Sequence, residues 1–141
     1  MINSKDGSLN LKEFELKPFS KFELTDQFKA GNIQEIRDIN NGWKWLDVIN
    51  LKIDNQYFKL SLGYFENRLN LVSMVFQETQ MDESSTWKNW SEKNEIKNQE
   101  KFEKWLNKEI GKQRNFNWGN IDSSYDSKSG FSSIYINYKE N

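Results

Sequence analysis

Residues 33 to 77 alternate between apolar and polar side chains, with interruptions at short segments that each contain Asn. A period of two indicates β-strands, whose successive side chains point to opposite faces of a sheet. The interruptions fall at 40–42, 54–56 and 66–68, and Asn, Asp and Gly tolerate the positive φ that hairpin turns require. The stretch therefore predicts four antiparallel strands in a meander. On the second strand, the period places these residues on one face: Trp43, Trp45, Ile49, Leu51 and Ile53.

A helical period follows the meander. Ser91 can cap a helix, and the pattern continues from 92 to 110 until Gly111 stops it. Glu–Lys pairs line one side of this predicted helix. The opposite side carries an apolar stripe with the spacing i, i+3, i+4 and i+8, formed by Phe102, Trp105, Leu106 and Ile110.

The two ends of the chain add further strands. Residues 9–16 alternate as a short first strand that Pro18 ends, because Pro cannot donate to a ladder. Residues 118–125 and 131–138 alternate on either side of the turn sequence DSKSG. The patterns together predict an α+β fold: a twisted antiparallel sheet, made of the meander and the C-terminal hairpin, with one long amphipathic helix packed on one face.

The 141 residues are enough for one domain with a real core, and no Gly- or Ser-rich linker divides them. We expect a single domain spanning residues 1–141. No run approaches the ~18 apolar residues needed to cross a bilayer, and the first residues lack the basic and apolar regions of a signal peptide. These features predict a cytoplasmic chain with no membrane partner, and they leave the oligomeric state open.

The composition restricts the possible chemistry. The chain has neither Cys nor His, which excludes disulfides, zinc–thiolate sites and the Ser-His-Asp and Cys-His catalytic sets. The net charge is −1, from 20 basic and 21 acidic residues. A nucleic-acid-binding protein usually shows a basic excess or a basic face, so a nucleic-acid partner is not expected. We expect a protein that is not an enzyme and that uses no cofactor or metal.

The acids near the C-terminus match a calcium loop only in part. Asp122, Ser124 and Asp126 occupy the first, third and fifth positions of an EF-hand-like spacing. The Gly and the bidentate Glu that such a loop requires are replaced by Ser127 and Ser133. A glycosidase pair would need two carboxyl groups facing a cleft, whereas acids beside a hairpin turn are usually exposed. We expect Asp126 to begin the turn and to bond its own backbone.

Six Trp residues raise the question of a stacking surface. Trp105 lies on the helix stripe, and at least one of Trp43 and Trp45 should be buried. Two Trp residues lie in the polar segment before the helix and are the best candidates for exposed aromatic side chains, which are enriched at protein interfaces. Together with two neighbouring acids, they form the predicted protein-binding residues: Trp87, Trp90, Asp82 and Glu83.

Three segments of the C-terminal half resemble a known group of proteins. They are WSEKNE at 90–95, FEKWLNKEIG at 102–111 and WGNIDSSYDSKSGFSSIYINY at 118–138. The segments are similar to those of small bacterial orphan proteins associated with immunity to polymorphic or contact-dependent toxins. The resemblance implies a cytoplasmic, non-catalytic protein that binds and neutralises a cognate toxin domain. It carries over no binding residues, because the shared pattern consists of helix, strand and turn positions.

Two other classes of function stay open. The Trp residues are compatible with a domain that binds a carbohydrate or another small ligand. An enzyme that uses carboxylates or Lys would need a concave pocket with two convergent acids.

Overall fold

The computed structural model describes residues 1–81 and 91–140, which form a seven-stranded antiparallel sheet and one α-helix. The sheet order is β3-β4-β5-β6-β9-β8-β7. Its elements are β3 (Ile33–Asp38), β4 (Trp43–Ile53), β5 (Gln56–Phe65), β6 (Arg68–Gln77), α1 (Glu92–Ile110), β7 (Asn115–Phe116), β8 (Gly119–Asp126) and β9 (Phe131–Tyr138).

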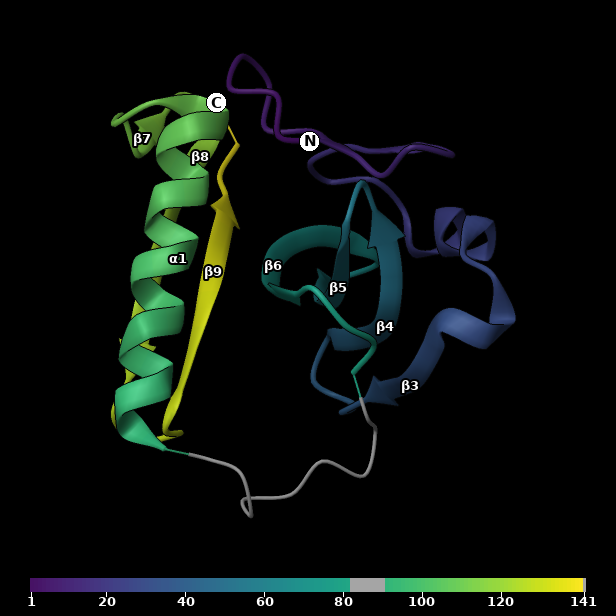
Figure 1. Cartoon of the computed structure of the whole chain (residues 1–141). Helices are drawn as coiled ribbons and strands as arrows, with labels where there is room; N and C mark the ends of the chain where they lie inside the picture. The colour runs from purple at the N-terminus through teal and green to yellow at the C-terminus, as the bar shows by residue number, and fades with distance from the viewer. Residues whose placement is uncertain (82–90, 141) are drawn as a thin grey trace.

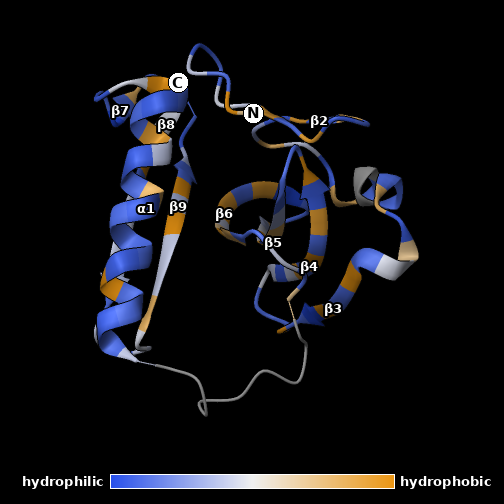
Figure 2. Cartoon of the chain, in the orientation of Figure 1, coloured by the Kyte–Doolittle hydropathy of each residue, from blue (hydrophilic) through white to orange (hydrophobic). Residues whose placement is uncertain are grey.

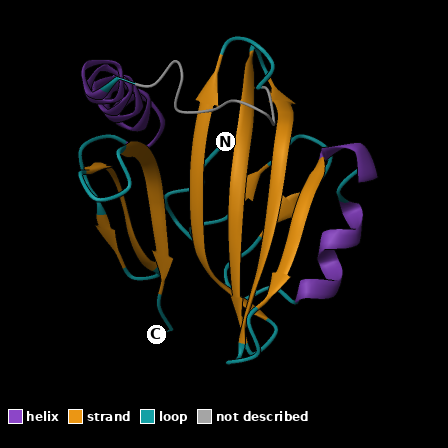
Figure 3. Ribbon diagram, turned by 90° about the horizontal axis from the view of Figure 1, so that it is seen from below, coloured by secondary structure: helices purple, strands orange, loops and turns teal. Residues whose placement is uncertain are grey.

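The meander and the C-terminal hairpin form two parts of this sheet. Strands β3 to β6 lie side by side in chain order. β9 pairs with β6 along part of its length, and β8 and β9 otherwise stand away from the meander together with α1 (Figures 1 and 3). The helix packs on the hairpin and on the edge of the meander. The predicted α+β fold, a meander plus a hairpin with the long helix on one face, is therefore confirmed.

The predicted helix begins and ends where its capping residues are. Ser91 accepts a hydrogen bond from the amide of Asn94 at 3.1 Å, and Gly111 ends the helix at φ 78°. Most of α1 is hydrophilic (Figure 2), as expected of a helix with one narrow apolar stripe. Phe102 and Leu106 are buried, and the other two stripe residues, Trp105 and Ile110, are half-buried against the core.

The period of two breaks within β4. Val48 and Leu51 pair with residues of β5 that are only two apart, so β4 contains one extra residue between them. Asn50 takes a φ of 56° at this bulge. Leu51 therefore lies on the same face as Val48, while Trp43 and Trp45 lie on the other face. The prediction that these five residues share one face is therefore wrong: Trp43, Trp45, Ile49, Leu51 and Ile53.

One face of the sheet is buried. α1 covers it beside β8 and β9, where the Phe102 ring lies 5.0 Å from the ring of Phe76. The N-terminal segment covers the meander, where Phe22 meets Tyr64 edge to face at 5.2 Å. The fully buried side chains of this core include Leu46, Leu60, Leu62, Met74, Leu106, Ile121 and Ile134.

The N-terminal segment is a small hairpin followed by 3-10 turns. The single strand predicted over 9–16 is wrong, because Lys12 takes a φ of 75° and its amide bonds the side chain of Asn10 at 3.0 Å. The chain turns back there, and Leu9 pairs with Leu16. The elements are β1 (Leu9–Asn10), β2 (Glu15–Leu16), η1 (Phe22–Gln27) and η2 (Ala30–Asn32).

The hairpin joins the meander through a short ladder. β6 and β9 share four register pairs, and the last one joins Met74 to Ile134. If the ladder continued in the same register, Phe76 would lie opposite Ser132. The two strands instead diverge at this point, which explains why β8 and β9 stand apart from the other strands (Figure 3).

Side chains of α1 bind the backbone groups at the divergence. Lys101 Nζ donates to the carbonyl of Phe76 at 3.2 Å, and the amide of Ser132 donates to Glu95 Oε2 at 2.8 Å. Burial of Lys101 against the rings of Phe76 and Phe102 lowers the pKa of its ammonium group. Two oppositely charged helix residues thus take the place of ladder partners, because a buried backbone group needs a hydrogen bond.

Candidate functional site

The face of the sheet opposite the core carries a group of large side chains at one corner. The register places Arg37 opposite Trp45, and Trp43 opposite Phe65. The amide of Ile39 donates to the carbonyl of Trp43 at 3.3 Å. Ile39 therefore lies opposite Trp43 and on the same face as Arg37. We call this set the outer aromatic surface, and it consists of Arg37, Ile39, Trp43, Trp45 and Phe65.

The rings of the outer aromatic surface support one another. Trp43 and Trp45 stack with their centroids 5.8 Å apart and their planes within 15°, and Phe65 lies 5.2 Å from Trp43. Gly63 makes room for this arrangement, because a Cβ there would come within 2.8 Å of the Trp45 ring. Phe65 is 37% exposed and Ile39 is 51% exposed. The surface therefore presents contiguous apolar area to solvent.

A buried carboxylate orients the arginine of this surface. Asp47 is only 8% exposed, and both of its oxygens lie 3.2 Å from Arg37 Nη2. Ser61 Oγ also donates to Asp47 at 2.7 Å. The guanidinium lies 5.8 Å from the centroid of the Trp45 ring, in a cation–π arrangement. Paired and stacked in this way, the guanidinium is held in place while the side chain of Arg37 remains 43% exposed.

The predicted protein-binding residues lie outside the described residues: Trp87, Trp90, Asp82 and Glu83. The sequence predicted that Trp43 and Trp45 share a face with the apolar residues at the end of β4, and that at least one of the two is buried. It did not identify Arg37, Ile39 or Phe65, since cross-strand neighbours depend on the register. The alternation around Trp43 and Trp45 was the one signal in the sequence that pointed to this face.

The acids of the C-terminal hairpin bond the backbone. Asp126 Oδ1 accepts from the amide of Lys128 at 2.9 Å, which confirms its expected place at the start of the turn. Asp122 Oδ1 accepts from the amide of Ser123 at 2.9 Å. No group of three acids in residues 1–81 and 91–140 is arranged to hold a metal ion.

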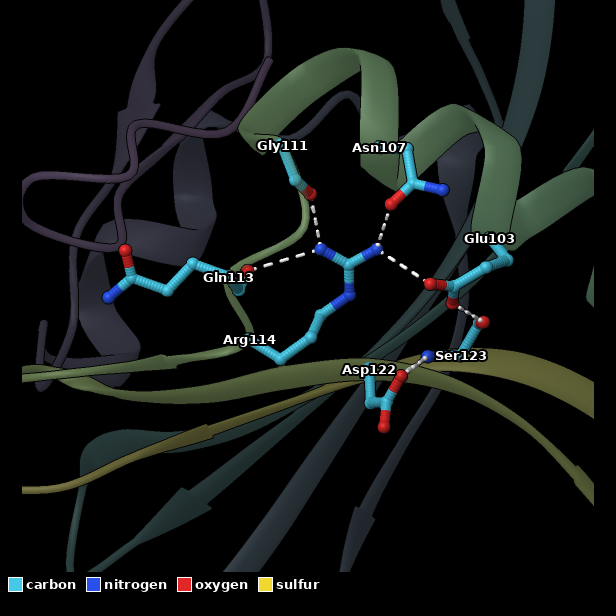
Figure 4. A network of polar contacts seen from close by, with 7 residues as sticks. All are labelled: Glu103, Asn107, Gly111, Gln113, Arg114, Asp122 and Ser123. Carbon is cyan, nitrogen blue, oxygen red and sulfur yellow. Dashed lines mark hydrogen bonds and ion pairs between the residues drawn. The ribbon is translucent and has the colours of Figure 1, made fainter.

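A polar network fixes the end of α1 against β8 (Figure 4). Arg114 Nη2 donates to Glu103 and to Asn107, both at 2.7 Å. The second oxygen of Glu103 accepts from Ser123 Oγ at 2.6 Å. The bond from Ser123, followed by Arg114, lowers the pKa of the Glu103 carboxyl. Because these side chains bind one another, the network stabilises the contact between the helix and the sheet.

A polar pocket of about 350 Å³ lies beside β7. Its lining contains no carboxylate, so it lacks the two convergent acids that the enzyme hypothesis requires. Phe116 stacks on Trp118 there at 4.9 Å, and Trp118 Nε1 donates to the carbonyl of Ser4. The indole of Trp118 is thus already hydrogen-bonded and stacked within the fold. The lining residues are Ser4, Lys5, Gln113, Asn115, Phe116, Asn117 and Trp118.

The fold and the surface together define an α+β protein whose twisted antiparallel sheet has its helix on one face and aromatic side chains on the other. None of the helices in the described part of the chain is long and apolar enough to cross a membrane. No family model and no curated protein matches the sequence.

Among solved structures, the chain is similar to one in the structure of Rhs1-CT in complex with the cognate immunity protein RhsI1. The two chains share 15% sequence identity and superpose with a TM-score of 0.54. The match covers 98% of this chain and 86% of the other. At this identity the likeness is one of fold, and the predicted resemblance to immunity proteins is confirmed at that level.

Proposed function

We propose that this protein binds a cognate toxin domain and neutralises it, without catalysing a reaction itself. The observation that carries the proposal is the fold likeness, over 98% of the chain, to a structure that contains an immunity protein with its cognate partner. The resemblance of residues 90–138 to immunity proteins supports the same function independently, because it was drawn from strand, turn and helix positions in the sequence.

Neutralisation by binding fits the composition of the chain. A chain without His or Cys lacks the commonest general base and any thiolate nucleophile, but binding a protein requires neither. The exposed corner of the sheet offers Trp and Arg, the residue types that dominate binding energy at protein interfaces. We infer that the protein acts as one domain in the cytoplasm, where an intracellular toxin would meet its inhibitor.

The test is co-expression with the C-terminal domain encoded by the gene next to this one. We expect cells that produce both proteins to grow, and the two proteins to elute together in size-exclusion chromatography. An unrelated toxin domain is the control, and it should remain toxic in the presence of this protein. Continued toxicity of the cognate domain, with no complex formed, would refute the proposal.

Carbohydrate binding is a second candidate, and the nearly parallel rings of Trp43 and Trp45 favour it. Sugars stack on exposed aromatic faces, so binding should change the fluorescence of these indoles. A titration with a panel of glycans measures this change in the wild type and in Trp43→Phe. A flat signal for every glycan would remove this candidate.

A further inference from the structure

We propose that the outer aromatic surface is where the partner binds, and that the partner places a carboxylate on Arg37 and apolar side chains on Ile39, Trp43 and Phe65. This inference rests on the proposed function and deepens it, because it identifies the surface and the chemistry of the partner.

Two exposed apolar residues, Ile39 and Phe65, lie together with stacked indole rings on this surface. α1 and the N-terminal segment cover the other face of the sheet, where the buried side chains lie. On the outer face, Ile39 and Phe65 lie on either side of Trp43, which stacks on Trp45. These four side chains come from strands β4 and β5 and the end of β3. Rings already stacked on one another lose little side-chain entropy on binding, which favours affinity.

The charges of the surface select a carboxylate on the partner. Asp47 is buried and both of its oxygens are occupied by Arg37 or Ser61, so it cannot accept a cation from a partner. Arg37 is the accessible cation at this point, and a guanidinium has five donors in a planar fork. Arg37 contacts Asp47 through Nη2 and Glu35 through Nε, so these two ion pairs do not require the donors of Nη1. A partner carboxylate can bind this side of the fork.

Glu35 is the competing charge and does not block the arginine. Its carboxylate lies 3.9 Å from Arg37 Nε, a long contact, and its side chain is 59% exposed. An exposed ion pair of this kind contributes little, so Glu35 can turn to solvent when a partner carboxylate approaches. The guanidinium then presents its remaining donors beside the apolar area of the surface.

A protein fits this surface better than a nucleic acid does. Nucleic acids are bound through several phosphate contacts made by Lys and Arg. The outer aromatic surface has a single cation, Arg37, with the carboxylates of Glu35 and Asp47 next to it, in a chain of net charge −1. One carboxylate within an apolar patch is instead common on protein surfaces, where charged pairs fix the orientation of the complex.

The experiment measures the affinity of the full chain for the C-terminal domain encoded by the neighbouring gene, by isothermal titration calorimetry. Ile39→Asp and Phe65→Ala change exposed side chains and leave the Asp47–Arg37 pair intact. We expect each to weaken binding at least tenfold. The matched control is Ile96→Asp, at a position on α1 that is 42% exposed, and it should change Kd less than twofold.

The arginine is tested through the salt dependence of binding. Arg37→Gln removes the charge but can still donate one hydrogen bond, so we expect weaker binding that depends less on salt than that of the wild type. Lys97→Gln, at an exposed position of α1, makes the same change in charge and is the control. Far-UV circular dichroism confirms that each variant is folded. Equal salt dependence in Arg37→Gln and the wild type would overturn the assigned carboxylate.

The outcomes separate the inference from the function on which it rests. If the wild type binds and Ile39→Asp and Phe65→Ala bind equally well, the surface is wrong and the proposed function stands. If the wild type does not bind the domain, both the proposed function and the assigned surface are wrong. If a single-stranded oligonucleotide binds this surface and the domain does not, the partner is not a protein.

Discussion

At the scale of single residues, two buried tyrosines differ in what their hydroxyl groups bind. Tyr138 donates to the carbonyl of Gly7 at 2.7 Å, while the hydroxyl of Tyr64 has no hydrogen-bond partner among the described residues. Burial raises the pKa of both hydroxyls above the ordinary value, so both stay protonated. Comparing the same substitution at these two positions therefore isolates the effect of the hydrogen bond.

We expect Tyr138→Phe to lower the free energy of unfolding by about 1 kcal/mol, because it leaves the Gly7 carbonyl without its donor. Tyr64→Phe removes a buried hydroxyl that lacks a described partner, and should leave stability unchanged or raise it. Urea unfolding of the two variants measures the difference. Equal losses in both would contradict this account of the Tyr138 bond.

Glu103 makes stability depend on pH. Its folded-state pKa lies below its ordinary value of 4.5, first because Ser123 donates to it. A lowered pKa means that folding favours the ionised form, so this contribution is present above pH 4.5 and is lost as the pH falls through the folded-state pKa. The carboxylate is partly exposed, and solvent screening keeps the contribution small.

Ser123→Ala should therefore cost about 1 kcal/mol at pH 7. The difference from the wild type should shrink as the pH falls below 4.5, because protonation weakens the bond in the wild type as well. Urea midpoints from pH 7 to pH 3 follow this difference. Ser124→Ala, at the next position of β8, is the control. A cost for Ser123→Ala that stays constant with pH would show that Glu103 is not the group involved.

The sequence predicted residues whose role is local and missed those whose role depends on cross-strand neighbours. Asp126 and Ser91 were identified because each bonds the backbone within three residues of itself. Arg37 and Phe65 reach the outer aromatic surface through pairing with β4, and pairing follows from the register. A sequence pattern contains no direct signal for register once a bulge is present.

At the scale of the elements, the start of β8 depends on Gly119. This residue has a φ of 146°, and a Cβ there would lie 2.0 Å from the carbonyl oxygen of Asn137 on β9. The obstacle is backbone, so it cannot rotate away. Gly31, in η2, has no atom within 4 Å of the equivalent position and therefore serves as a control.

We expect Gly119→Ala to destabilise the protein by several kcal/mol, roughly 3 or more, because the hairpin must separate to relieve the contact. Gly31→Ala should be neutral or slightly stabilising, since it restricts the unfolded chain. Thermal unfolding compares the two variants. A Gly119→Ala protein as stable as Gly31→Ala would mean that the β8–β9 pairing differs from the one described.

The divergence of β6 and β9 gives a prediction for α1. Glu95 and Lys101 bind the backbone groups of Ser132 and Phe76 that a continued ladder would have paired. Glu95→Ala should speed amide hydrogen exchange at Ser132 on the order of tenfold, because the amide loses its acceptor. Glu100→Ala, at an exposed helix position, should not. Unchanged exchange at Ser132 in Glu95→Ala would contradict the proposed role of the helix.

The elements themselves were largely predictable, and their faces were less so. The turns around 40–42, 54–56 and 66–68 and the helix over 92–110 follow from local residue preferences. The bulge in β4 does not, because Asn50 lies between apolar residues and resembles an ordinary alternating position. Because of one extra residue there, Trp43 and Trp45 do not share the predicted face with Leu51 and Ile53.

At the scale of the whole molecule, the N-terminal segment connects the two parts of the sheet. The carbonyls of Ser4 and Gly7 accept from Trp118 and Tyr138, near the end of the hairpin. Leu9 and Leu16 in turn belong to the core that covers the meander. The short β6–β9 ladder and this segment therefore both connect the meander to the hairpin, and the predicted single domain depends on these two connections.

We expect the chain to unfold as one unit despite the divergence of the strands. Phe76 of the meander contacts Phe102 and Trp105 of α1, at ring distances of 5.0 and 5.4 Å, so neither part can bury its apolar surface alone. Urea transitions followed by far-UV circular dichroism and by Trp fluorescence should coincide.

Phe102→Ala removes one of these contacts. It should lower the midpoints of both transitions together and reduce the free energy of unfolding by roughly 3 kcal/mol. Two separate transitions in the wild type would mean that the meander and the hairpin with α1 fold independently, and the single-domain prediction would then be wrong.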